Sequence, residues 1–85
     1  SDGSKLQRVV LVPLEPMGVK MLGLVTREAL DELPGKNLIS VYIPLSYMLG
    51  GITVLVDPSK VEKVDMPVDV ALKLSVTSWI KAKAE

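Results

Sequence analysis

The first apolar positions of the chain form two short runs separated by a turn signal. Residues 8–14, "RVVLVPL", and residues 19–26, "VKMLGLVT", are rich in valine and leucine. The intervening "EPMG" has Pro16 and Gly18 where a type I turn favours proline second and glycine fourth. We therefore predict a β-hairpin. Pro13 has no N–H to donate, so we expect it on a sheet edge or at the end of its strand.

The longest apolar stretch, residues 37–56 or "NLISVYIPLSYMLGGITVLV", contains no charged residue and has the length of a membrane-spanning helix. Pro44 and the pair Gly50-Gly51 argue against a helix, because proline costs about 3 kcal/mol and glycine about 1 kcal/mol in a helix interior. The β-branched and aromatic residues on either side are typical of strands. We predict two buried strands joined by an apolar loop rather than a membrane span.

Two further segments connect these strands to the rest of the chain. Residues 26–37, "TREALDELPGKN", fit either a short helical turn capped by Thr26 or a solvated loop, and the sequence does not decide between them. After the turn at "DPSK", residues 61–66 form a short alternating segment.

The C-terminal segment has the pattern of an amphipathic helix. Pro67 suits an early helical position, and Asp69 would lie in the first turn, where the helix dipole favours an acid. We expect the helix to continue through the tail, with Lys81 and Lys83 in its last turn. One face carries the residues Val68, Ala71, Leu72, Ser75, Val76 and Trp79. We expect this face to pack on the sheet, with Trp79 as its largest buried anchor.

The predicted fold class is α+β, with about four to five mainly antiparallel strands and a C-terminal helix packed on one face. Residues 1–7 are expected to be a polar lead-in or an expression remnant. Residues 8–85 are expected to form a single small α+β domain, because 85 residues suffice for one modest core.

Composition narrows the possible chemistry. The chain has ten basic and ten acidic residues, no histidine and no cysteine. Without histidine or cysteine, the usual general acid–base groups, thiolate nucleophiles and transition-metal ligands are missing. We therefore expect no enzyme activity, no cofactor and no metal site. A balanced charge without a basic run also gives no support for nucleic-acid binding.

The loop inside the uncharged stretch is the candidate functional site. Surface loops are usually polar, but this one is apolar, so it either folds over an open end of the core or faces a partner. We favour the covering role, although tyrosine and methionine are also common at interfaces. The candidate interaction residues are Leu45, Ser46, Tyr47, Met48 and Leu49, and Pro44, Gly50 and Gly51 shape the loop backbone.

The order of these features resembles a known family. "RVVLVPLEPMGVKMLGLVT", followed by "VYIPLSYMLGGITVLVDPSKVEKVDMPVDVALKL", is similar to the soluble domain of domain-of-unknown-function family 502, which includes the plant continuous-vascular-ring proteins. The resemblance spans roughly residues 8–76 and implies an excised soluble portion, or a truncated relative, of a membrane protein with two preceding hydrophobic helices. The chain departs from the family at Pro67, where a serine cap is common, and in the tail "SVTSWIKAKAE", where a small-residue, glycine-ending tail is common.

These observations favour a non-enzymatic domain of an integral membrane protein that mediates protein–protein contact or self-association. Membrane attachment would come only through segments absent from this chain, and the side of the membrane stays open. Exposed sheet edges offer strand addition as a binding mode. The alternative is a small-molecule or lipid-binding module in which residues 44–51 act as a lid over an aliphatic pocket.

Overall fold

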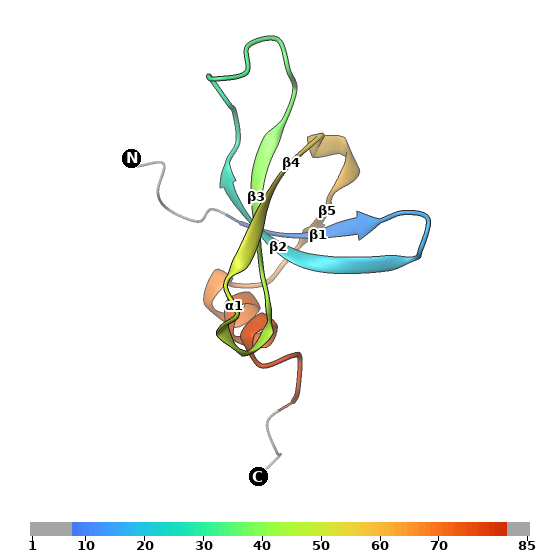
Figure 1. Cartoon of the computed structure of the whole chain (residues 1–85), viewed down its shortest axis with the longest axis vertical. Coiled ribbons are helices and arrows are strands. Elements are labelled where there is room, and N and C mark those ends of the chain that lie inside the picture. The colour runs from blue at the N-terminus through green and yellow to red at the C-terminus, as the bar shows by residue number, and fades with distance from the viewer. Residues whose placement is uncertain (1–7, 82–85) are drawn as a thin grey trace.

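The computed structural model describes residues 8–81, which form one five-stranded antiparallel sheet and one α-helix (Figure 1). The lead-in at residues 1–7 and the tail from residue 82 lie outside the described part. The order across the sheet is β4-β3-β2-β1-β5. The strands are β1 (Arg8–Leu14), β2 (Val19–Arg27), β3 (Ile39–Pro44), β4 (Gly51–Val56) and β5 (Glu62–Val64), and the helix is α1 (Val68–Val76). The predicted α+β fold class is confirmed.

The first two strands form the predicted hairpin, but its turn is of a different kind. The Met17 N–H donates to the Leu14 carbonyl at 3.1 Å, so Pro16 is the third residue of the turn and not the second. The Glu15–Pro16 peptide bond is cis, which is the arrangement that places proline third. Pro13 lies next to the end of β1, as predicted, beyond the three residues of β1 that pair with β5.

The sheet bends sharply along β2. Only the second half of β2, from Leu24 onward, pairs with β3, whereas the first half pairs only with β1. The β1–β2 hairpin therefore swings away and crosses β3 and β4 at a wide angle (Figure 1). Gly23 stands at this point, and a Cβ atom there would meet the side chain of Val41. The missing side chain allows the two halves of the sheet to approach each other.

Each face of the sheet carries its own apolar cluster. The inner face of the bend buries β-branched residues from three strands: Val10, Val12, Val25, Ile39, Val41 and Ile43. The opposite face buries Val9, Leu22 and Leu24 against Ala71 of α1. The expected packing of the helix on one face of the sheet is therefore present, and Ala71 is its central contact.

The segment between β2 and β3 is a solvated loop, one of the two alternatives that the sequence left open. Thr26 does not cap a helix, because it lies within β2 beside an irregularity in the β2–β3 pairing. Its hydroxyl oxygen lies 2.6 Å from that of Ser40 on β3. This contact pairs both hydroxyl groups and satisfies the polar side chain of buried Ser40.

The C-terminal helix is shorter than predicted. It begins after Pro67 and ends at Val76, so Lys81 and Trp79 lie beyond it, and Lys83 lies outside the described residues. The Trp79 N–H closes the end by donating to the Leu74 carbonyl at 2.8 Å, with Ser78 and Trp79 at positive φ. Serine and threonine compete for backbone hydrogen bonds, which explains why the helix stops at "VTS". The prediction that Trp79 is a buried anchor is wrong, since its side chain is 54% exposed.

Candidate functional site

The loop at residues 44–51 is only partly a cover for the core. Pro44 is buried and Leu45 is half-buried, but Tyr47 and Leu49 are 65% and 75% exposed. The covering role that we favoured from the sequence is therefore wrong for Tyr47 and Leu49. The predicted interaction role of Met48 concerns a side chain outside the described part of the chain.

The loop backbone explains this arrangement. Residues Ser46–Met48 form a 3₁₀ turn, η1, and the Leu45 N–H donates to the Gly50 carbonyl at 2.9 Å. Gly50 has a φ of +88°, a backbone conformation that favours glycine. At Gly51, a Cβ atom would meet the Tyr42 ring, so glycine is needed there for close packing.

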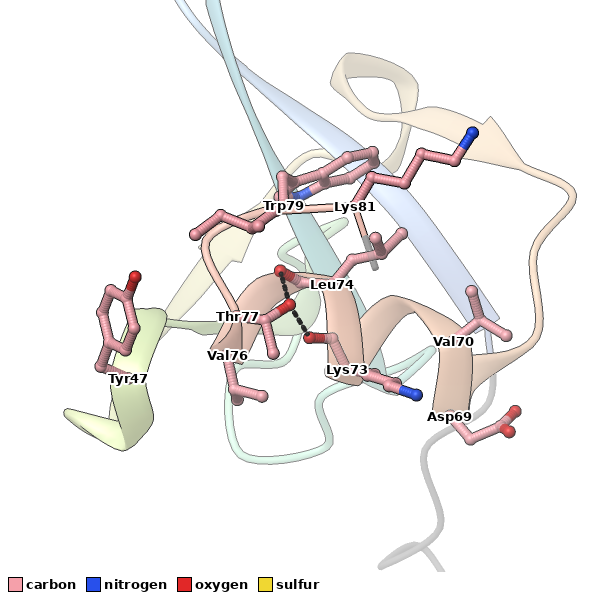
Figure 2. Close-up of a pocket in the computed structure, with 10 residues that line it drawn as sticks. Tyr47, Asp69, Val70, Lys73, Leu74, Val76, Thr77, Trp79 and Lys81 are labelled. Carbon is pink, nitrogen blue, oxygen red and sulfur yellow. Dashed lines mark hydrogen bonds between the residues drawn. The ribbon is translucent and has the colours of Figure 1, made fainter. Parts of the chain in front are cut away.

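An apolar hollow of about 860 Å³ lies between this loop and the end of the helix. Figure 2 shows Tyr47 on η1, Leu74 and Val76 on α1, and Trp79 on the segment that follows. Val70 and Ile80 complete the apolar lining, and Ile80 is 64% exposed. We call this surface the loop–helix hollow and define it by the apolar residues Tyr47, Val70, Leu74, Val76, Trp79 and Ile80.

Unusual backbone conformations gather around the hollow. Among the described residues, the non-glycine residues with positive φ are Tyr47, Ser78 and Trp79. Tyr47 and Trp79 line the hollow, and Ser78 joins α1 to Trp79. Such conformations cost free energy in residues with a side chain, and in folded proteins they concentrate at functional sites. Here they direct two aromatic side chains to the surface of the same hollow.

The polar groups at the rim of the loop–helix hollow offer little catalytic or metal-binding chemistry. Asp69, Lys73 and Lys81 border the hollow, and the Thr77 hydroxyl donates to the Lys73 carbonyl at 2.7 Å (Figure 2). Within residues 8–81, no group of three or more acidic side chains is placed to hold a metal ion. The arrangement is suited to binding apolar groups, with charges of both signs at its border.

The ion pairs of the described residues lie away from the hollow. Arg8 contacts Glu28 at 2.7 Å, and Arg27 contacts Glu32 at 3.0 Å. Hydrogen bonding to these arginines lowers the pKa of both glutamates. A third pair joins Lys20 to Glu62 across the sheet at 3.1 Å. These contacts tie strands and loops together and supply no reactive group to the site.

Sequence reasoning identified one side of the hollow and missed the other. Tyr47 was a candidate, whereas Val70, Trp79 and Ile80 were not. Trp79 extends the apolar stripe of the helix and was therefore assigned to the core. The signal that could have revealed the site was Val70 and Leu74, two apolar residues four positions apart that do not fall on that stripe.

None of the helices in residues 8–81 is both long and apolar enough to cross a bilayer. No curated protein and no solved structure gives a significant match to the chain. A family model described as "Protein of unknown function (DUF502)" matches residues 1–51. This match includes the first hairpin and the loop at 44–51, and it ends before the helix entry at residue 67, which we had included in the resemblance. Because the matched region is more than half of the 85 residues, the chain belongs to the DUF502 family.

Proposed function

We propose that this chain is a non-enzymatic association domain of a membrane-anchored protein, and that the loop–helix hollow is the surface by which it binds a partner protein. The supporting observation is the exposure of large apolar side chains from two separate segments at one place. Tyr47 comes from the loop, and Trp79 and Ile80 come from the segment that follows α1. Exposed apolar patches of this kind mark interaction sites.

The residue types that line the loop–helix hollow favour a protein as its binding partner. Tyrosine and tryptophan are enriched at protein interfaces, where a large apolar ring is buried and its polar atom finds a hydrogen-bond partner. Asp69, Lys73 and Lys81 offer a polar rim around the aromatic centre. The partner we propose therefore presents apolar side chains flanked by charges of both signs.

The membrane anchor and the absence of catalysis are parts of the same proposal. The anchor is supported by the resemblance to family members that carry hydrophobic helices before this domain. The absence of catalysis is supported by a sequence without histidine or cysteine.

The test measures the size of complexes formed by the natural full-length protein, extracted from its own membrane and separated on native gels. We expect the pair of substitutions Tyr47→Ser and Ile80→Ser to shift the complex to a lower mass. Met17→Ser is the matched control, because Met17 is 67% exposed on the distant hairpin turn. Complexes of unchanged mass in the double variant would refute the proposal.

A lipid titration distinguishes the alternative function, lipid binding, from the binding of a partner protein. In the isolated domain, saturable amide shifts on addition of lipid, confined to residues 45–51 and neighbouring strands, would support a lipid-binding lid instead. We expect no such saturable shifts.

A further inference from the structure

Strand β4 is an open sheet edge with unusual composition. It is the end strand in the order β4-β3-β2-β1-β5, and no described segment pairs with its outer side. Its sequence, "GITVLV", contains no charge and no proline. Ile52 and Leu55 are 49% and 50% exposed, on opposite faces of the strand. Soluble proteins normally protect such an edge with charges, proline or a bulge, because it can pair with another chain.

The opposite edge of the sheet has that protection. Strand β5 is only three residues long, Glu62–Val64, and two of the three are charged. Glu62 is also held in an ion pair by Lys20. The β5 edge is therefore protected against pairing with another chain, and the β4 edge is not.

The pairing of β4 with β3 fixes which backbone groups face outward. The Leu45 N–H donates to the Gly50 carbonyl, so residues 45 and 50 form a hydrogen-bonded pair. Hydrogen-bonded and non-hydrogen-bonded pairs alternate along an antiparallel ladder. In the observed register, Ile52 and Val54 therefore bond to β3, and Thr53 and Leu55 turn their N–H and C=O groups to the open side.

We infer that β4 pairs with β4 of a second copy of this chain, antiparallel and about a two-fold axis, to form a continuous ten-stranded sheet. This inference goes beyond the proposed function, because it uses a different surface from the loop–helix hollow. Strand addition of this kind gains main-chain hydrogen bonds along the whole edge.

Charge and length select a second β4 as the occupant. A β4–β5 contact would align six uncharged residues with three residues that include Glu62 and Lys63. A β4–β4 contact joins strands of equal length with no charge in either strand. The antiparallel direction also sends the two Asp57 carboxylates to opposite ends of the contact, whereas a parallel contact would place them side by side. A two-fold contact closes on itself, so it gives dimers and not fibres.

Sedimentation equilibrium and amide hydrogen exchange on the 85-residue chain test this inference together. The contact is small, so we expect a dimer with a dissociation constant of about 10 µM or weaker. As the concentration rises and dimer forms, the Thr53 and Leu55 amides should become slow to exchange. The Ile52 and Val54 amides should already be slower in dilute protein, because they bond to β3.

Two variants complete the test. Leu55→Lys places a charge on the open edge, the means by which natural edge strands avoid pairing, and should raise the dissociation constant by about tenfold or more. Met17→Lys, at an exposed apolar residue on the hairpin turn, should leave the dissociation constant unchanged. A chain that stays monomeric, a dimer in which the Thr53 and Leu55 amides stay fast, or equal dimerisation of the two variants would overturn the inference. Loss of the β4 contact would leave the loop–helix hollow unchanged. Failure of this inference can therefore be told apart from failure of the proposed function, which the native-gel experiment tests.

Discussion

Replacing Gly23 by alanine tests the sharp bend of the sheet. The added Cβ would overlap the Cγ1 atom of Val41 and would lie 3.4 Å from Val12 and 3.6 Å from Ile43. Val41 is fully buried, so its side chain cannot move out into solvent to relieve the overlap. Overpacking of a closed core costs about 1–3 kcal/mol. For a domain of this size, each kcal/mol lowers the melting temperature by roughly 4–8 °C.

A double-mutant cycle shows whether this particular overlap is the cause. Val41→Ala alone should cost about 2–3 kcal/mol through lost burial and the resulting cavity. Combined with Gly23→Ala, the new methyl occupies part of that cavity. The double variant should therefore be more stable than the sum of the two single effects predicts, by about 1 kcal/mol or more.

The assay is urea denaturation followed by far-ultraviolet circular dichroism. Val9→Ala is the matched control for the second site, because Val9 is buried on the opposite face of the sheet. Its effect should add to that of Gly23→Ala within about 0.5 kcal/mol. A neutral Gly23→Ala variant, or simple additivity with Val41→Ala, would refute the bend described here.

Three further predictions concern the end of the helix and the protein surface. Trp79→Ala should lower the free energy of unfolding by less than about 1.5 kcal/mol, because the side chain is half-exposed, and a loss of 3 kcal/mol in urea titration would contradict its position. Ser78→Gly should stabilise the fold by about 0.5–1 kcal/mol, because Ser78 has a φ of +57°, and a lower melting temperature would contradict this. The hydrogen bond from Arg8 lowers the pKa of Glu28 in the folded protein. The stabilisation from this bond is therefore present above the ordinary glutamate pKa and is lost as the pH falls through the lowered pKa of Glu28. The pair is partly exposed and worth less than about 1 kcal/mol, so Glu28→Gln should make the acid side of the stability profile slightly flatter, and an unchanged profile would argue against the contact.

Much of the sheet could be predicted from the sequence because its signals are local. Runs of β-branched residues define β1, β3 and β4, and proline or glycine marks the places where the chain turns. The interruption at Pro44, Gly50 and Gly51 was enough to exclude a membrane helix over residues 37–56. These features depend on the conformations that individual residues allow, so one sequence suffices to recognise them.

The remaining features depend on contacts between distant segments. Gly23 resembles any other strand glycine until Val41 is placed against it. The stripe from Val68 to Trp79 has perfect helical spacing, but hydrogen bonding by Thr77 and the closing bond from Trp79 end the helix first. Trp79 thereby moves from the predicted core to a surface that it shares with Tyr47. The sequence therefore revealed half of the candidate site, and only the fold brings in the other half.

Site-specific photo-crosslinking from position 47 tests the central claim most directly. A photoreactive phenylalanine analogue would replace Tyr47 in the natural full-length protein, and the same analogue at Met17 would serve as the control. The account predicts a protein adduct of one defined mass from position 47, lost when Ile80→Ser is added, and no such adduct from position 17. A lipid adduct alone, or the same adducts from both positions, would contradict the claim that the loop–helix hollow binds a partner protein.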